Sequence, residues 1–354
     1  IQGDEDRLVN VDIARRWAND RQLQIGVHAL RHRLDWTSIG RLLSDVAVSA
    51  IDCLLGHVFV QFTARHGQIT GAEWVVLAMG KLGGDAMTPS SDLDLIFVYR
   101  HAEDVIQSDG DKQLAPSQYF SRFSQRLISA ITATTTEGVL YEVDMRLRPS
   151  GNAGPIASHL SAFIQYHQDK SWTWEHMALS RARVICGSEK LNADISAIIK
   201  ETLTKPRDAD RLLKEVADMR LRIDGERHTD FIWDIKDIRG GLVDIEFIAQ
   251  YLQLLHADAH PEILSTNTGE ALTNLKDSGV LSEVHEKTLK SALELWQAMQ
   301  GMLQLTIGGY FKPERQSEIP EALKHALAKS GGCEIFQTLE EHMKEVAAKV
   351  YGIF

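Results

Sequence analysis

Two short apolar runs, residues 74–79 and 93–99, interrupt a sequence whose hydrophobic residues otherwise follow helical spacing. Short apolar runs bounded by turn residues are typical of buried strands. Residues 119–134 return to a spacing of three and four, and residues 139–147 alternate polar with apolar, as a half-buried strand does. We therefore predict an α+β fold whose middle runs strand, strand, helix, strand and forms a small mixed sheet.

The rest of the chain predicts helices on both sides of this sheet. Residues 9–64 have helical spacing, and so does most of the chain from about residue 200 onward. We expect an N-terminal helical segment over 1–68, a sheet core over 69–200 and a C-terminal helical bundle over 201–354. Within the bundle we expect helices at 208–227, 242–255, 270–274, 283–305 and 333–350.

The composition narrows the classes of function. The 354 residues carry 38 Lys and Arg against 49 Asp and Glu, a formal net charge of -11, which disfavours binding to nucleic acid or to an anionic membrane. Cys53, Cys186 and Cys333 lie far apart without zinc-ligand spacing, as expected in a reducing cytoplasm. No stretch reaches the roughly 18 consecutive apolar residues of a membrane helix. Because the first residue is Ile1, we expect a piece of a longer protein whose other half is a partner.

The candidate chemistry centres on acidic residues at the second predicted strand. Asp92 and Asp94 are spaced i, i+2, so on a strand they share one face about 7 Å apart and can reach a metal or a metal pair. Asp144 lies on the next predicted strand. Gly83 and Gly84 follow the first strand, where glycines let backbone N–H groups approach phosphate oxygens. Each feature alone is more often a solvated strand face or a plain turn, but the ordered combination favours a functional site.

Several common nucleotide and hydrolase motifs are missing from the sequence. Lys81 follows Gly80 but precedes Leu82 instead of Ser or Thr, and Val75 stands where a Walker loop has its first glycine. The chain has no G-x-G-x-x-G fingerprint and no G-x-S-x-G elbow. The His residues lack ligand spacing such as H-E-x-x-H, so we assign no His to a metal.

The pattern of D-x-D followed by a later Asp resembles the DNA polymerase beta-like nucleotidyltransferase superfamily. Four longer segments, residues 79–97, 141–150, 172–183 and 234–250, extend the match. Together they resemble the glutamine synthetase adenylyltransferase/adenylyl-removing enzyme family, which has one nucleotidyltransferase half that adds AMP and one that removes it. The form of residues 146–151 and 172–176 is more similar to the C-terminal, adding half.

This resemblance implies a nucleotidyltransferase core that transfers AMP from ATP to a tyrosine hydroxyl of glutamine synthetase, with two Mg²⁺ ions. Asp92, Asp94 and Asp144 are then the catalytic residues and metal ligands, and Asp144 is a candidate proton acceptor. The expected nucleotide-binding residues are Lys81, Gly83, Gly84, Ser91, Arg146, Arg148 and Lys236. The implied partners are glutamine synthetase and the PII signalling protein, in a bacterial cytoplasm.

Some of these assignments have a structural alternative. Lys81 is equally well read as a solvated turn residue, and Arg146 with Arg148 as salt-bridge partners of the acidic cluster. Lys236 belongs to a glycine-containing loop expected to close over the nucleotide, although Asp244 and Glu246 beside it also fit a solvated helix start. We expect Trp172 and Trp174 to be packing residues.

Three other functions stay open from the sequence. The same carboxylates fit phosphorolytic removal of AMP from glutamine synthetase. A nucleotide-sensing docking module without catalysis would need no complete acid triad, which disfavours it. Transfer of AMP to a different protein is the third.

Overall fold

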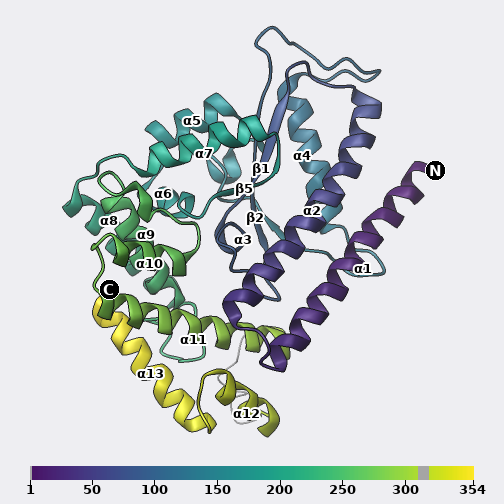
Figure 1. The fold of residues 1–354 in the computed structure, drawn as a ribbon. Coiled ribbons are helices and arrows are strands. Elements are labelled where there is room, and N and C mark those ends of the chain that lie inside the picture. Colours follow the sequence, from purple (N-terminus) through teal and green to yellow (C-terminus); the bar gives the residue numbers. More distant parts are fainter. Residues whose placement is uncertain (1, 310–318) are drawn as a thin grey trace. The chain divides into compact units, whose positions relative to one another are not determined.

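The computed structural model describes residues 2–309 and 319–354, and the side chains from residue 11 onward within these ranges. Its elements belong to two compact units (Figure 1). The first unit takes in Ile1–Gln24, Leu42–Asp85 and Ser91–Thr202, and the second takes in Ile25–Arg41, Ala86–Ser90 and Leu203–Phe354. The second unit takes up the chain at Leu203, close to the predicted boundary at residue 200. The predicted division into three domains stays a prediction.

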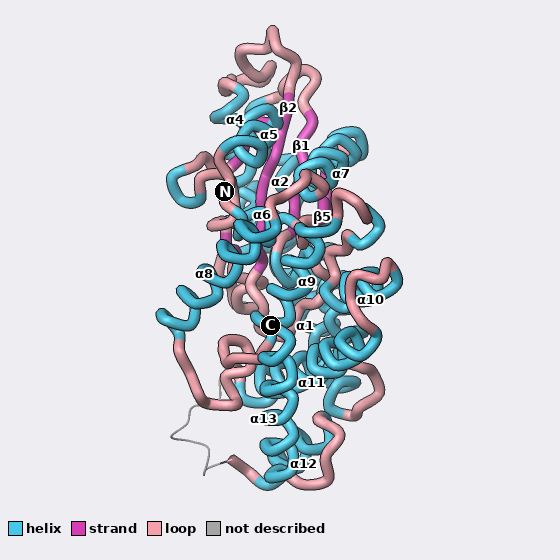
Figure 2. The backbone as a smooth tube through the Cα atoms, turned by 90° about the vertical axis from the view of Figure 1, so that its left-hand side faces the viewer, coloured by secondary structure: helices cyan, strands magenta, loops and turns pink. Residues whose placement is uncertain are grey.

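The first unit is built on a mixed sheet of five strands, drawn in magenta in Figure 2. β1 pairs antiparallel with β2 on one edge and with β5 on the other, while β3 and β4 both pair parallel with β2. The two parallel partners take up different parts of β2, β3 at its start and β4 near its end. The strands are β1 (Glu73–Ala78), β2 (Leu93–Arg100), β3 (Val143–Asp144), β4 (Ala157–His159) and β5 (Arg183–Gly187).

The central strands form because their side chains are apolar on both faces. Val75, Val76 and Leu77 of β1 are fully buried, and residues 95–98 of β2 are at most 3% exposed. Strands buried on both faces read as continuous apolar runs instead of alternating ones. The predicted strands at 74–79 and 93–99 are confirmed.

Helices of the first unit cover this sheet. Phe59 of α2, Trp74 of β1 and Phe123 of α4 form an aromatic cluster with ring centroids 5.2 to 6.4 Å apart, which joins both helices to the sheet. The fully buried Arg15 of α1 donates to the carbonyls of Ala130 and Ala133 at the end of α4. The helices are α1 (Gln2–Leu30), α2 (Trp36–His66), α3 (Gly80–Gly83), α4 (Pro116–Thr132), α5 (Leu160–Asp169), α6 (Thr173–Leu179) and α7 (Glu189–Leu203).

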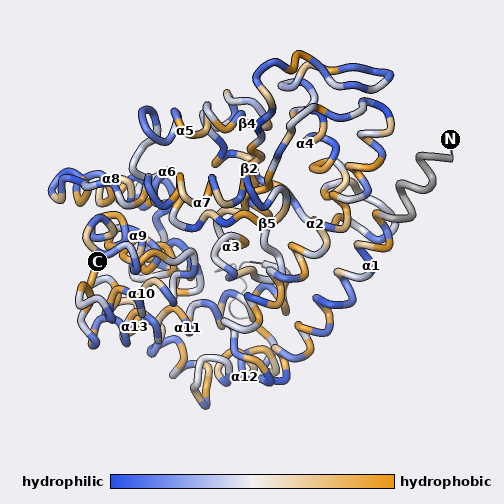
Figure 3. Tube along the Cα trace, turned by 45° about the horizontal axis from the view of Figure 1, so that its top comes forward, coloured by the Kyte–Doolittle hydropathy of each residue, from blue (hydrophilic) through white to orange (hydrophobic). Residues whose placement is uncertain are grey.

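Helix α2 is the one helix in the described residues that is long and apolar enough, by length and composition, to cross a membrane. Its hydrophobic residues alternate with hydrophilic ones along the turns (Figure 3). Ile51, Leu54 and Phe62 are at most 1% exposed, so α2 contributes a buried face to the first unit. A core helix meets the same criteria of length and composition.

The second unit is mainly helical, and it includes the end of α1 and the start of α2. Trp233, Trp296 and Met299 lie at the centre of its core, each at most 2% exposed. Asp208, Asn267 and Ser282 cap three of its helices by accepting a backbone N–H two or three residues into the helix. The helices are α8 (Ala209–Arg227), α9 (Leu242–His256), α10 (Thr268–Asp277), α11 (Glu283–Ile307), α12 (Glu321–Ser330) and α13 (Phe336–Ile353).

One predicted strand is wrong in length. Alternation predicted a strand over 139–147, but only Val143 and Asp144 are in strand conformation. The strand ends there because the backbone N–H of Arg146 turns back to donate to Oδ1 of Asp144 at 2.7 Å. Asp and Asn side chains often offer the backbone such an alternative to a strand ladder. Residues beyond Asp144 therefore do not continue its strand face.

Candidate active site

Asp94 and Asp144 are brought together by the parallel pairing of β2 with β3. They are register partners in this pair, as are Leu93 and Val143 before them. Neighbouring strands lie about 5 Å apart, so two register partners are adjacent on the sheet. The sequence predicted both carboxylates, and the pairing shows that they come from neighbouring strands. Asp92, just before β2, is exposed.

Gly80 shapes the space beside Asp94. Its φ of +55° is a left-handed conformation that glycine adopts easily, and a Cβ at this position would lie 2.1 Å from Oδ2 of Asp94. The backbone N–H of Met79 donates to the carbonyl oxygen of Asp94 at 2.9 Å. The turn after β1 is therefore fixed against the strand that carries the acidic residues.

Arg146 is the cationic partner of Asp144. Its Nε donates to Oδ2 of Asp144 at 2.7 Å, and its side chain is 74% exposed. The hydrogen bond from Arg146 lowers the pKa of Asp144. The pKa of Arg146 is raised, first by its hydrogen bond to Asp144 and then by charges that include those of Asp94 and Asp92. All three carboxylates therefore act on one guanidinium.

These carboxylates fit Mg²⁺ in donor chemistry. Mg²⁺ prefers hard oxygen ligands and uses one or two carboxylates together with substrate phosphates. Within residues 2–309 and 319–354 no group of three His, Cys, Asp or Glu side chains converges on one point that could hold a metal ion. The adjacent pair of Asp94 and Asp144, with Asp92 nearby in sequence, provides the number of carboxylates that a phosphate-bridged ion requires.

The glycines after β1 have a packing role. A Cβ on Gly83 would lie 1.9 Å from the carbonyl oxygen of Arg181, so only glycine fits there. The N–H of Gly83 donates to Met79 and that of Gly84 to Gly80, at 2.9 and 3.2 Å. Both N–H groups are thus used inside the turn. Contact of these glycines with phosphate stays a prediction, as it does for the half-buried Lys81 and Ser91.

Arg148 supports its own loop. Its side chain is buried, and Nη1 donates to the carbonyl oxygen of Met145 at 2.6 Å, while Nε donates to that of Gly154 at 3.4 Å. Arg146 and Arg148 do not share a strand face, because the strand ends at Asp144. A direct contact between Arg148 and phosphate stays a prediction.

Lys236 belongs to the second unit, in the loop between α8 and α9, and is exposed. The sequence was compatible with a solvated Asp244 at the start of a helix, but its side chain is fully buried. Its two oxygens accept from Nε of Arg220 and from the backbone N–H of Gly240, both at 2.5 Å. The buried pair of Arg220 and Asp244 therefore holds the loop that carries Lys236.

The expectation that Trp172 and Trp174 are packing residues is wrong. Trp172 is 70% exposed and Trp174 is 37% exposed. Both lie at the start of α6. There the backbone of Trp172, and not its ring, has a structural role, because its N–H donates to Oε2 of the buried Glu175 at 2.8 Å. The contact of Glu175 with Tyr166 was not predicted. The only signal was a Glu three residues into a helix, the position that reaches back to the first N–H groups.

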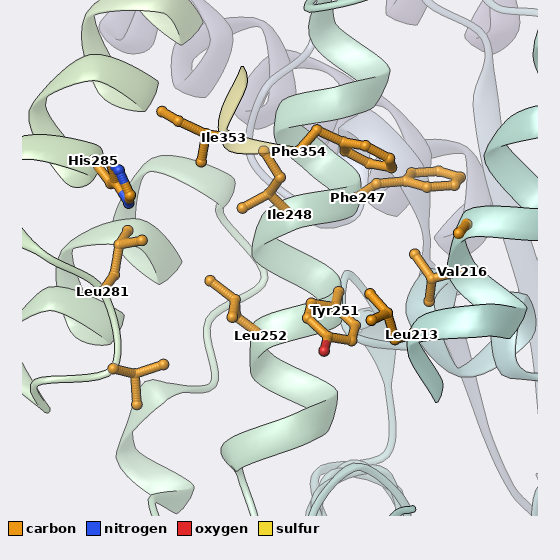
Figure 4. Close-up of a pocket in the computed structure, with 12 residues that line it drawn as sticks. Leu213, Val216, Phe247, Ile248, Tyr251, Leu252, Leu281, His285, Ile353 and Phe354 are labelled. Carbon is orange, nitrogen blue, oxygen red and sulfur yellow. The ribbon is translucent and has the colours of Figure 1, made fainter. Parts of the chain in front are cut away.

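The second unit has two described cavities that contain none of the predicted site residues. One, of about 280 Å³, is mainly apolar and is shown in Figure 4. It is lined by residues of α8, α9, the start of α11 and the C-terminal end of α13, among them Val216, Tyr251, His285 and Phe354. The other, of about 480 Å³, is more polar and is lined by His32, Glu294, Lys329 and His342 among others.

Comparison with known proteins gives the family. The family profile described as glutamate-ammonia ligase adenylyltransferase matches residues 2–198. The chain belongs to this family. A second profile, described as PII-uridylyltransferase, matches residues 209–354.

Two curated relatives share one name with each other, and both are longer than this chain. The chain is 42% identical over 344 residues to the bifunctional glutamine synthetase adenylyltransferase/adenylyl-removing enzyme of Bradyrhizobium sp. (strain BTAi1 / ATCC BAA-1182), a match that covers 97% of this chain and 35% of the relative. It is 43% identical over 355 residues to the enzyme of the same name from Mesorhizobium japonicum, which covers 99% of this chain and 35% of the relative. The chain thus spans about a third of the length of these relatives.

Proposed function

We propose that this chain transfers AMP from ATP to a tyrosine hydroxyl of glutamine synthetase, releasing pyrophosphate. The observation that carries the proposal is the adjacent placement of Asp94 and Asp144 on β2 and β3, with Asp92 acting on the same guanidinium. The names of the relatives supply the protein substrate and the transferred group. Because those relatives are about three times as long, the activity of this segment by itself is part of the proposal.

In this proposal Asp92, Asp94 and Asp144 hold two Mg²⁺ ions. Bound Mg²⁺ would neutralise charge on the transferred phosphate and on the leaving pyrophosphate. Asp144 would also accept the proton of the attacking tyrosine hydroxyl. Gly80 keeps the space beside Asp94 clear, since any side chain there would collide with its carboxylate.

Arg146 is proposed to bind the triphosphate. Its guanidinium is exposed, and its position is fixed by the contact with Asp144. Guanidinium groups bind phosphate oxygens through charge-assisted hydrogen bonds. We assign Lys81, Gly83, Gly84 and Ser91 to the turn that faces the phosphates. Arg148 is proposed to stabilise the loop that carries Arg146. Lys236 is also proposed as a nucleotide-binding residue.

The partners proposed for the chain follow from the same family. Glutamine synthetase is the protein substrate. We propose that the second unit responds to the PII protein, which is supported by its match to a profile named for PII-uridylyltransferase. The other half of the enzyme is a further partner, and the bacterial cytoplasm is the proposed location. Three free cysteines agree with a reducing compartment.

The test is incubation of the chain with Mg²⁺, ATP labelled at the α-phosphate, and unmodified glutamine synthetase. We expect label on one tyrosine, and a loss of about 100- to 1,000-fold in rate for Asp94→Asn, the range seen when charge stabilisation at a reacting group is removed. Asp104→Asn is the matched control, because Asp104 is an exposed carboxylate of the same unit. If wild-type chain transfers no label but releases AMP from modified synthetase when phosphate is added, the direction is wrong.

A further inference from the structure

Arg183 of β5 binds the turn of residues 79–85, which follows β1. Its Nη2 donates to the carbonyl oxygen of Leu82 at 3.1 Å and to Oδ1 of Asp85 at 2.5 Å. The contact with Asp85 is an ion pair in which each side chain is 33% exposed. One guanidinium therefore contacts the turn at two points, a carbonyl in its middle and a carboxylate at its end.

The pairing of the strands brings Arg183 to this turn. β5 runs antiparallel to β1, and Arg183 is the register partner of Ala78, the last residue of β1. The turn begins directly after Ala78, so Arg183 starts one strand away from it. A Cβ on Gly83 would lie 1.9 Å from the carbonyl oxygen of Arg181. The turn thus packs closely on the backbone that leads into β5.

Asp85 has a backbone conformation that its surroundings must hold. Its φ is +51°, a left-handed conformation that is uncommon for a residue with a side chain, although Asp and Asn adopt it more readily than most. Its N–H donates to the carbonyl oxygen of Leu82 at 3.3 Å, a long hydrogen bond. The charge-assisted contact with Arg183 is the stronger of the two.

The other end of the turn contacts the strand that carries the acidic site. The N–H of Met79 donates to the carbonyl oxygen of Asp94 at 2.9 Å, and Gly80 lies against the carboxylate of Asp94. Within the turn, the N–H of Gly83 donates to Met79 at 2.9 Å and that of Gly84 to Gly80 at 3.2 Å. Hydrogen bonds thus connect the part of the turn that Arg183 binds with the part that contacts Asp94.

We propose that Arg183 and Asp85 are positioning residues that set the turn of residues 79–85 for binding of Mg-ATP. This inference rests on the proposed function, in which Lys81, Gly83 and Gly84 of this turn face the phosphates. Neither residue of the ion pair needs to touch the nucleotide, because their contacts go to the turn and to each other.

The first experiment compares Arg183→Met with wild type. Methionine keeps the unbranched apolar part of the side chain and loses both contacts with the turn. We expect KM for Mg-ATP to rise by about tenfold or more, since small misplacements of binding groups have effects of this size. KM for glutamine synthetase should stay the same. A merely structural loss would lower the active fraction and leave both KM values unchanged.

Amide exchange supplies a readout that does not depend on activity. In Arg183→Met we expect hydrogen exchange at the amides of Gly83 and Asp85 to become about tenfold faster, because the turn opens more often. Arg100→Met is the matched control for both readouts. Arg100 lies in the same sheet and also pairs with carboxylates, but its partner Glu73 is the first residue of β1, at the end away from the turn.

The second experiment uses two substitutions of Asp85 that both permit its positive φ. Asp85→Gly permits the conformation but removes the acceptor for Arg183, so we expect a higher KM for Mg-ATP and faster exchange. Asp85→Asn keeps an acceptor oxygen, so we expect a smaller rise in KM than for Asp85→Gly. If both residues act through one contact, the double variant Asp85→Gly/Arg183→Met will match Arg183→Met alone, whereas independent effects would multiply.

Two results would overturn the inference. A wild-type KM for Mg-ATP in both Arg183→Met and Asp85→Gly would show that the ion pair does not affect nucleotide binding. A higher KM in Arg183→Met alone, with wild-type exchange in the turn, would show that Arg183 contacts the nucleotide directly and does not act through the turn.

The proposed function and this inference fail in different ways. If the wild-type chain transfers no AMP in either direction, the proposed function fails. The dissociation constant of Mg-ATP and the amide exchange rates in Arg183→Met still show whether Arg183 sets the turn for the nucleotide. If wild type is active and Arg183→Met has the KM and the exchange rates of wild type, the positioning role alone is refuted.

Discussion

Asp94 and Asp144 are register partners in a parallel strand pair, although 49 residues lie between them in the sequence. Parallel pairing requires a crossover connection, which here contains helix α4. Their adjacency depends on the register, because a slip by one residue would send one carboxylate to the opposite face. The acidic site is thus a property of the sheet and not of one loop.

Replacing Gly80 by Ala should damage the acidic site. Its Cβ would lie 2.1 Å from Oδ2 of Asp94, and φ is +55°. We expect a loss of about 1–3 kcal/mol in unfolding free energy and at least a tenfold loss of AMP transfer. The matched control is Gly138→Ala, since Gly138 also has a positive φ, of +88°, but no atom within 4 Å of an added Cβ. Equal loss of activity in both variants would show that backbone strain, and not the collision with Asp94, is responsible.

Removing the Arg146 guanidinium should weaken nucleotide binding without unfolding the chain. The side chain is 74% exposed, so Arg146→Ala should change the unfolding free energy by less than about 1 kcal/mol. Since we assign it to the triphosphate, KM for Mg-ATP should rise by about tenfold. Arg211→Ala, at another exposed arginine with a carboxylate partner, is the control. A KM equal to that of wild type would remove Arg146 from the nucleotide site.

Breaking the buried ion pair of the second unit should be strongly destabilising. Arg220 and Asp244 are both fully buried, and Arg220→Met leaves Asp244 with only the more distant Arg239, 3.8 Å away, as a charged partner. Such a change typically costs about 3–5 kcal/mol, which chemical denaturation will measure. In contrast, Arg211→Met breaks an exposed pair with Glu215 and should leave the unfolding free energy nearly unchanged. Similar losses of unfolding free energy in the two variants would contradict the conclusion that the pair of Arg220 and Asp244 is important for stability because it is buried.

His167 should make the first unit less stable in mild acid. Burial, and secondarily the charge of His176, lower its pKa from 6.5 to about 4. The folded state therefore binds fewer protons than the unfolded state between these values. The unfolding free energy should fall by about 1.4 kcal/mol per pH unit as pH drops from 6.5 towards 4, with no contribution above that window.

The pH profile of His167→Phe provides the comparison for this effect. Phenylalanine keeps an aromatic ring next to Phe163, whose ring centroid lies 4.6 Å from that of His167. The difference between the two profiles isolates the titration of His167 from that of the other histidines. Parallel profiles for wild type and variant would show that His167 titrates normally.

The sequence predicted the strands and helices that carry strong patterns. The runs at 74–79 and 93–99 became β1 and β2, and the helical spacing of 208–227, 242–255 and 283–305 became α8, α9 and α11. The strand at 139–147 was overpredicted, because alternation cannot reveal that the side chain of Asp144 bonds the backbone of Arg146. The short elements β4, β5 and α6 were missed, since each has too few residues to show a period.

The acidic residues of the site were identified from spacing, but their arrangement was not. The sequence gives no information on which strands pair, so it did not show that Asp94 faces Asp144. The alternating strand predicted over 139–147 implied one shared face for Arg146 and Arg148, whereas the turn after Asp144 buries Arg148 in its own loop. The contact of Tyr166 with Glu175 was missed, because the sequence does not show that α5 and α6 bring these two side chains together.

The buried contact of Arg220 with Asp244 also couples the folding of the segments that it joins. Arg220 comes from α8, Asp244 from α9, and the carbonyls of Asp237 and Ile238 that Arg220 also binds come from the loop between them. An intermediate with only one of these segments in place would bury a charge without its partners. The two helices and their loop should therefore open and close as one cooperative unit, with amide protons that exchange at a common rate.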